Sequence, residues 1–289
     1  MIIGKTGGVK LRAEPIAHIE EKIEMNLKSI FFLLIAAFFA SSILYGADES
    51  KEPQPGESRT VKIADVDVAF RWCPAGEFTM GSPDEENGRE NDELAHRVVI
   101  TRGYWLAETE TTQGLWRAVM GENPSQSDSI GDNFPVDSVS WRDCQNFISQ
   151  IQRYAPKGMK FRLPTEAHWE YACRAGSETA YSWGNEWNSN NANGFVRTTK
   201  SVGYYGYANA WGLTDMHGNV WEWCSDWYGA YPTDGATDPE GPSEGTKRVI
   251  RGGSWSFGAW FCRSARRFKL SPEFSDYYRG FRLELADAF

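Results

Sequence analysis

Glycine and tryptophan constrain what this chain can fold into more than any other feature. The 289 residues include 28 glycines and 13 tryptophans. After Gly176 helical periodicity disappears, and Gly, Asn, Trp and Tyr dominate the stretches YSWGNEWNSNNANGF and YYGYANAWGLTDMHGNVWEWCSDWYGAYP. Segments of this composition form irregular loops that large aromatic side chains hold in place. Since helix–strand alternation and a fixed-period repeat are both absent from the sequence, the pattern predicts one α+β domain with much coil.

Three short helices are expected before that region. Thr112, Ser140 and Thr165 each precede a run with apolar residues at three- and four-residue steps, as helix-capping side chains do. Gly121 and Gly176 follow the first and third runs, where glycine commonly ends a helix. Two earlier stretches with short alternating runs are typical of strands: VKIADVDVAFRWC and HRVVITRGYWLAETETT.

The N-terminal region has the layout of an export signal. From Met25 the chain runs MNLKSIFFLLIAAFFASSILYGADES, with one lysine, an apolar run from Ile30 to about Leu44 and small residues after it. We interpret residues 25–47 as a signal peptide, or alternatively as an uncleaved N-terminal anchor. Residues 1–24 are interpreted as a misassigned extension upstream of Met25, residues 48–60 as a flexible linker, and residues 61–289 as the folded domain. The protein is therefore expected in the periplasm, the cell envelope or the extracellular space.

The charge balance excludes one class of partner. The formal net charge is −9 at pH 7 and the isoelectric point is about 5.1. Nucleic-acid surfaces need a basic footprint, so no nucleic-acid partner is expected. No membrane contact is expected beyond the possible N-terminal anchor.

The five cysteines show none of the spacings of a zinc site. Cys144 and Cys173 fall on the apolar faces of the second and third expected helices, where they act as small buried hydrophobic residues. Because the number of cysteines is odd, at least one stays unpaired within a single exported chain.

Several motifs together resemble the formylglycine-generating enzyme, or sulfatase-modifying factor, family. They occur in the order of that family over roughly residues 66–286: FTMGSP, GYWLAETETTQGLW, MGENPS, PVDSVSWRDC, FRLPTEAHWEYACRAG, GLTDMHGNVWEWCSDWY, RVIRGGSW, CRSARR and GFRL. The resemblance implies a single domain related to the C-type-lectin fold, low in regular secondary structure. It also implies an activity: oxidation of a sulfatase cysteine to formylglycine with O₂ and a copper ion held by two cysteine thiolates.

The resemblance further implies calcium. In the stretch DMHGNVWEW the family's ligands fall on Asp215, Glu222 and the carbonyls of Gly218 and Val220, and hard cations such as Ca²⁺ take mixed carboxylate and carbonyl oxygens. The residues alone also permit a plain turn closed by Asp215, with Glu222 solvated or paired to an arginine.

A second calcium site of the family begins at positions that match Asn193 and Gly194. The downstream acidic residue that it needs is missing from the segment GFVRTTKSV. This second site is left open.

Only one of the family's two copper-binding cysteines has a counterpart in this sequence. Counted from Gly252-Gly253-Ser254-Trp255, the family's second cysteine falls on Cys262 and its first falls on Phe257. Copper(I) prefers soft thiolates, and a phenylalanine ring supplies none, so copper binding is not expected from this pair. Ser254 and Trp221 match active-site residues of the family, and with Cys262 they form the candidate catalytic set.

Three interpretations of Cys262 remain open. It can be a reactive thiol whose pKa is lowered by Arg263, Arg266 or Arg267, a disulfide partner, or a buried structural residue. The sequence therefore leaves two functions. One is an exported protein of sulfatase-modifying-factor type that acts on a sulfatase-like protein, with an incomplete oxidase site. The other is a non-catalytic C-type-lectin-like module that binds a protein or a carbohydrate.

Overall fold

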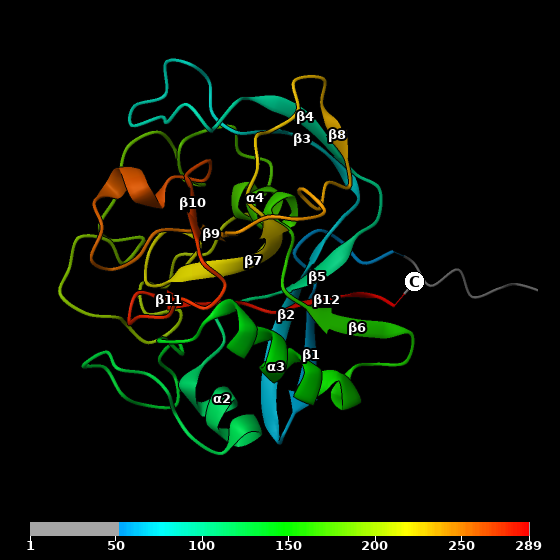
Figure 1. Cartoon of the computed structure of the whole chain (residues 1–289), viewed down its shortest axis with the longest axis vertical. Helices are drawn as coiled ribbons and strands as arrows, with labels where there is room; N and C mark the ends of the chain where they lie inside the picture. Colours follow the sequence, from blue (N-terminus) through cyan, green and yellow to red (C-terminus); the bar gives the residue numbers. More distant parts are fainter. Residues whose placement is uncertain (1–51, 289) are drawn as a thin grey trace, which may run out of the picture. The chain divides into compact units, whose positions relative to one another are not determined.

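A computed structural model describes residues 52–288, and those from Pro53 onward form one compact unit. The unit combines three small sheets with three α-helices and long connecting loops (Figure 1). The predicted α+β domain with little regular structure is therefore confirmed. No helix among the described residues has the length and apolar character needed to span a bilayer. The expected signal peptide or anchor at 25–47 and the extension at 1–24 lie outside these residues.

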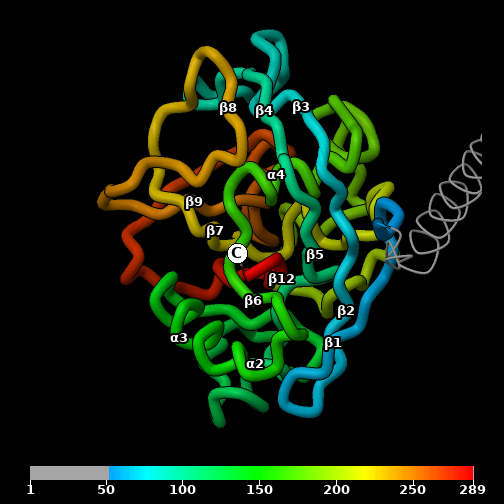
Figure 2. Tube along the Cα trace, turned by 90° about the vertical axis from the view of Figure 1, so that its right-hand side faces the viewer, coloured from blue at the N-terminus to red at the C-terminus, as the bar shows by residue number. Residues whose placement is uncertain are grey.

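The largest sheet joins the two ends of the domain. Its order is β1–β2–β5–β12–β6, with the bounds Ser58–Ile63, Val66–Cys73, Tyr104–Ala107, Glu284–Asp287 and Met159–Arg162. Every neighbouring pair in it is antiparallel. The C-terminal strand β12 thus lies between β5 and β6, and β5 separates it from the N-terminal hairpin β1–β2 (Figure 2).

The linker expected over 48–60 ends earlier than the sequence indicated. Strand β1 begins at Ser58, and the amide of Gly56 already donates to the carbonyl of Trp72 at 2.9 Å. The polar side chains of Ser58 and Thr60 suit this position because β1 is an edge strand whose outer residues face water. The last residues of the polar segment 48–60 therefore belong to strand β1 of the sheet.

A four-stranded sheet and a three-stranded sheet complete the domain. The first has the order β10–β9–β7–β11, with the bounds Arg267–Leu270, Arg248–Arg251, Trp221–Trp227 and Arg279–Gly280. The second has the order β3–β4–β8, with the bounds Gly76–Met80, His96–Ile100 and Ala236–Thr237. Strand β7 carries Trp221 and Glu222 into the interior, and the loop after β9 carries Ser254 and Phe257.

The three helices begin at the predicted capping residues. Helix α2 spans Gln113–Met120 after Thr112, α3 spans Trp141–Ile151 after Ser140, and α4 spans Glu166–Arg174 after Thr165. Each capping oxygen accepts an amide hydrogen of the first turn, which satisfies a donor that the helix itself leaves free. Helix α2 ends at Gly121 in the left-handed conformation.

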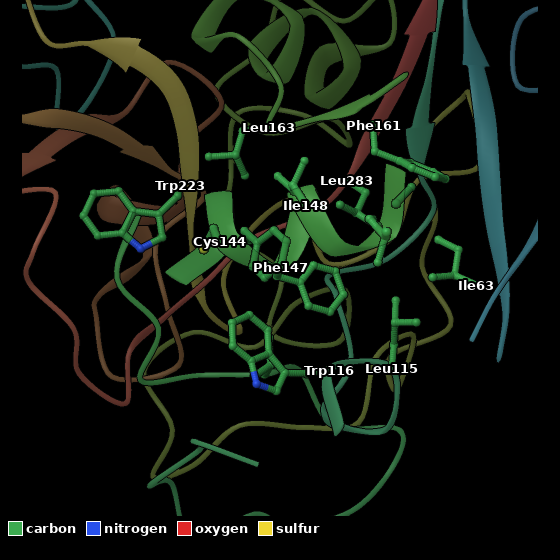
Figure 3. Close-up of a cluster of buried hydrophobic side chains, with 14 of the residues drawn as sticks. Ile63, Leu115, Trp116, Cys144, Phe147, Ile148, Phe161, Leu163, Trp223 and Leu283 are labelled. Atoms are coloured by element: carbon green, nitrogen blue, oxygen red, sulfur yellow. The ribbon is translucent and has the colours of Figure 1, made fainter. Parts of the chain in front are cut away.

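A main core lies around α2 and α3 and reaches the large sheet (Figure 3). The ring of Trp116 from α2 stacks on Phe147 of α3, with centroids 5.0 Å apart, and Phe281 meets both rings edge-on. Cys144 is buried in this core, as its position on a helix face predicted. A second cluster of buried apolar side chains surrounds Trp169 of α4 and includes Cys173.

Candidate functional site

The loop that follows β9 is built on two glycines. Gly252 and Gly253 have φ angles of +94° and +76°, which side chains other than glycine rarely adopt. A Cβ on Gly253 would also lie 2.6 Å from the sulfur of Cys262. The amide of Gly218 donates to the carbonyl of Gly252 at 2.7 Å, and that of Trp255 to Asn219 at 2.9 Å. These bonds hold the loop against the segment that leads into β7.

Phe257 occupies an aromatic cluster. Its ring meets Trp221 edge-on at a centroid distance of 5.8 Å, Tyr278 at 5.6 Å and Phe261 at 5.2 Å. The aromatic rings occupy the position at which the family resemblance implies the first copper thiolate. Their carbon atoms supply no soft ligand for copper. The donor set that the chain presents here does not fit a two-thiolate copper ion.

Cys262 is buried in a different cluster, against Ala180 and Tyr181. It is fully inaccessible, and burial alone raises the pKa of its thiol to about 12. At neutral pH it is therefore a thiol, whereas the nucleophilic and metal-binding form is the thiolate. The geometry supports the interpretation of Cys262 as a buried structural residue and speaks against a reactive thiol.

The arginines that follow Cys262 do not lower the pKa of its thiol, because each is occupied by carboxylates. Their partners are Glu86 and Glu93 for Arg263, Glu90 and Glu93 for Arg266, and Glu166 for Arg267. All five cysteines carry free thiols, so the disulfide alternative for Cys262 is wrong.

Ser254 and Trp221, the other two candidate catalytic residues, are both buried beside this cluster. Trp221 is the first residue of β7 and is almost wholly inaccessible. Ser254 is fully buried, and its hydroxyl has no hydrogen-bond partner among residues 52–288. The structure thus packs Trp221 on Phe257, while the carbonyl of Ser254 accepts from the amide of Phe257 at 3.0 Å. The sulfur of Cys262 lies against the preceding residue, Gly253, and belongs to the neighbouring cluster.

Outside Phe257 the rings continue into an exposed group, here called the aromatic surface: Phe195, Trp255, Tyr277 and Tyr278. Trp255 lies 6.1 Å from Tyr277 and 5.2 Å from Tyr278 between ring centroids, and the two tyrosines lie 4.3 Å apart. The backbone of Phe195 lies along the same loop, because its amide donates to the carbonyl of Phe257 at 3.0 Å, and 79% of its surface is exposed. The sequence reasoning missed both tyrosines, although the adjacent pair in SDYYRGFRL was a visible signal.

The four expected calcium ligands do not form an open site. Glu222 is fully buried, and both its oxygens accept from Arg282, at 2.6 and 2.7 Å, while the indole of Trp169 adds a third bond at 2.7 Å. The side chain of Asp215 accepts from the amide of Gly203 at 2.6 Å.

Gly218 and Val220, which were expected to supply carbonyls, are both buried beside these groups. Within residues 52–288, no group of three or more His, Cys, Asp or Glu side chains is arranged to hold a metal ion. Glu222 thus takes the alternative role of an arginine's partner.

The second calcium site is equally occupied by the protein. The amide nitrogen of Asn193 donates to the side-chain oxygen of Asn219 at 2.9 Å, and the carbonyl of Asn193 accepts from the backbone amide of Asn219 at 2.9 Å. A Cβ on Gly194 would lie 2.9 Å from the ring of Trp187. Asn193 therefore joins the loop that contains it to the one that contains Asn219.

Calcium should leave the stability of this protein unchanged. A ligand that binds only the folded state raises the melting temperature by mass action, so melting curves with excess calcium and with a chelator should coincide here. Differential scanning calorimetry at constant ionic strength measures this, with magnesium as the matched control. A rise specific to calcium that disappears in Asp215→Ala would restore the calcium assignment.

The relation to known proteins is broad. Residues 68–286 match the family model described as the sulfatase-modifying factor enzyme 1-like domain. The chain belongs to this family. It is 36% identical over 209 residues to a formylglycine-generating enzyme of Thermomonospora curvata, a match covering 64% of this chain and 65% of the relative. It is 31% identical over 179 residues to a Bos taurus protein named inactive C-alpha-formylglycine-generating enzyme 2, with 57% and 52% covered.

The fold agrees with the family. The solved structure of Treponema denticola variable protein 1 matches with a TM-score of 0.70 and 28% identity, covering 78% of this chain and 98% of that one. The expected fold of a formylglycine-generating-enzyme-like domain, related to C-type lectins, is thereby confirmed. Since the match to the Thermomonospora enzyme spans 65% of that protein's length, its whole activity does not transfer with the fold.

Proposed function

We propose that this chain is an exported member of the sulfatase-modifying factor family that binds a protein ligand and does not oxidise it. The observation that carries the proposal is the ring of Phe257, packed against Trp221 and Tyr278 at the position of the first copper thiolate. Cys262 alone, buried with its pKa raised, replaces neither the missing ligand nor its charge. The Bos taurus relative named inactive C-alpha-formylglycine-generating enzyme 2 is consistent with this proposal, because its name describes a related protein without the activity.

The aromatic surface supports ligand binding. Phe195 is 79% exposed and its backbone is bonded to that of Phe257, while Tyr277 is 40% exposed and its ring packs on those of Trp255 and Tyr278. Large exposed aromatic side chains held rigid supply most of the binding free energy at protein interfaces, because little conformational entropy is lost when a partner covers them. The partner proposed is an exported polypeptide of the sulfatase type, in keeping with the enzymes to which the chain is related.

Export rests on the apolar run of the segment 25–47. Cell fractionation of the protein expressed from Met25, with detection of its C-terminus, tests it. Recovery outside the cytoplasm is expected, whereas a full-length soluble cytoplasmic product would contradict export.

Binding should depend on the aromatic surface and not on the thiol of the ligand. Wild-type protein should bind a sulfatase-derived cysteine peptide and its serine counterpart equally well. Tyr277→Ala and Phe195→Ala should each weaken binding about fivefold to fiftyfold, since truncation of a central aromatic contact costs about 1–2 kcal/mol or more.

Fluorescence anisotropy with labelled peptides measures these affinities. Leu94→Ala is the matched control, because Leu94 is a 38%-exposed apolar side chain outside the aromatic surface. Equal affinities for wild type and both aromatic variants would contradict the proposed surface. Binding of a glycan in place of the peptides would favour the carbohydrate alternative.

A further inference from the structure

A cavity of about 840 Å³ lies where the segments 83–90, 178–187 and 259–263 meet. The first segment belongs to the loop after β3, and the last contains the 3₁₀ turn Ala259–Cys262, which lies on the same side of the molecule (Figure 1). No member of the aromatic surface lines this cavity. It is therefore separate from the surface to which the proposed function is assigned, and its volume falls in the range of small-ligand sites.

The walls of the cavity carry an excess of negative charge. Glu85, Glu178 and Glu186 line it, and none of the three forms an ion pair with another residue of the range 52–288. All three side chains are exposed to solvent. The lining of the cavity therefore favours a cation over an anion.

The two arginines on the same walls do not neutralise these carboxylates. Arg263 donates to Glu86 at 2.5 Å and to Glu93 at 2.8 Å. Arg89 lies 3.2 Å from Asp84. Both guanidinium groups are thus already paired within the protein, which leaves the three free carboxylates without a cation.

Aromatic rings form the rest of the lining. Trp260 is 55% exposed and lies close to two glycines: a Cβ on Gly88 would lie 2.8 Å from its Cβ, and one on Gly258 3.1 Å from its ring. Trp187 meets Tyr181 edge-on, with centroids 5.5 Å apart. An indole that is more than half exposed is available to a ligand.

We propose that this cavity binds a guanidinium or alkylammonium group. Such cations are attracted to the faces of tryptophan rings within about 6 Å of the centroid and form strong charge-assisted hydrogen bonds with carboxylates. The free carboxylates and the exposed indole of Trp260 provide both kinds of contact in one cavity that is open to solvent. Because the inference does not use Phe257 or the aromatic surface, it stands or falls independently of the proposed function.

Titration calorimetry with two probes tests this site. One probe is agmatine, a small free cation, and the other is a blocked peptide with a central arginine; the same peptide with neutral citrulline is the ligand control. Wild-type protein should bind at least one cationic probe and not the citrulline peptide, and affinity should fall as ionic strength rises. Binding of agmatine alone indicates a small amine as the natural ligand, and binding of the arginine peptide alone indicates a protein segment.

Variants identify the cavity as the binding site. The double variant Glu178→Gln, Glu186→Gln should weaken binding at least about tenfold, the equivalent of ~1.4 kcal/mol. Trp260→Ala, which keeps the charge, should weaken it as well. Glu244→Gln removes one exposed carboxylate outside the cavity and should have no effect. Absence of binding by wild type, or equal affinities in wild type and the cavity variants, would overturn the proposal.

Discussion

Replacing Arg282 with methionine should destabilise the fold by about 3–5 kcal/mol at neutral pH, since removing one partner leaves a buried charge uncompensated. Arg282 is fully buried and binds both oxygens of Glu222. It also donates to the carbonyls of Ala107 and Thr214 at 3.1 and 3.0 Å. No apolar side chain can replace these bonds.

The stability lost in Arg282→Met should depend on pH. Burial raises the pKa of Glu110 well above its usual value, and the negative charges of Asp215 and Glu222 raise it further, while Arg282 opposes this. Arg282 also lowers the pKa of Asp215, which burial raises. Without Arg282, the pKa values of Glu110 and Asp215 rise further in the folded state, which then binds more protons than the unfolded chain. Stability of the variant should therefore fall as pH increases above about 4.5, the ordinary pKa of glutamate, and the deficit should be smallest in acid.

Urea unfolding of wild type and variant across this pH range measures the effect. Arg97→Met is the matched control, because Arg97 and Glu77 form an ion pair of which both side chains are more than 60% exposed. Exposed pairs contribute about 0–1 kcal/mol, so the control should lose no more than that. A variant at Arg282 as stable as the control would show that the buried pair does not hold β7 to the C-terminal region.

Copper(I) should not bind tightly to the wild-type protein. The chain offers a phenylalanine ring and one buried thiol where two thiolates are needed, and the pKa of that thiol is raised to about 12. Competition with a chromogenic copper(I) chelator should leave the metal on the chelator. Because affinity for copper(I) depends on paired soft ligands, the expected difference from a two-thiolate site is many orders of magnitude.

Phe257→Cys provides the matched comparison. It restores the second thiol but removes a ring that packs on Trp221, Phe261 and Tyr278, which should cost about 3–5 kcal/mol of stability. Its melting temperature is therefore measured before copper is added. Tight copper binding by wild type that survives Cys262→Ala would show that other residues hold the metal, and tight binding that is lost in that variant would show that one thiol suffices.

The helices could be predicted from residues that are neighbours in the sequence. Much of the remaining structure could not, because its strands pair with distant segments of the chain. Thr112, Ser140 and Thr165 cap α2, α3 and α4 because capping needs only residues within the first turn. Strand β7 was read as coil because nearly all its residues are buried, so it lacks the alternation that marks a half-exposed strand.

The candidate site shows the same limit. That Phe257 stands at the position of the first copper ligand follows from the family resemblance and a count along the chain, and the structure packs its ring against Trp221 and Tyr278. That Glu222 pairs with Arg282 could not be predicted, because the two residues are 60 positions apart. A carboxylate can bind either a calcium ion or an arginine side chain, so the residue type does not distinguish the two. The state of Cys262 likewise depends on Ala180 and Tyr181, which only the fold brings to it.

Formation of an aldehyde on a cysteine-containing sulfatase peptide tests the central claim most directly. Wild-type protein, supplied with copper(I) and O₂, should leave the peptide unchanged in mass, with an active formylglycine-generating enzyme of the family as the positive control. Turnover by wild type that is abolished in Cys262→Ala would contradict the account, because a single cysteine would then be sufficient for the oxidation.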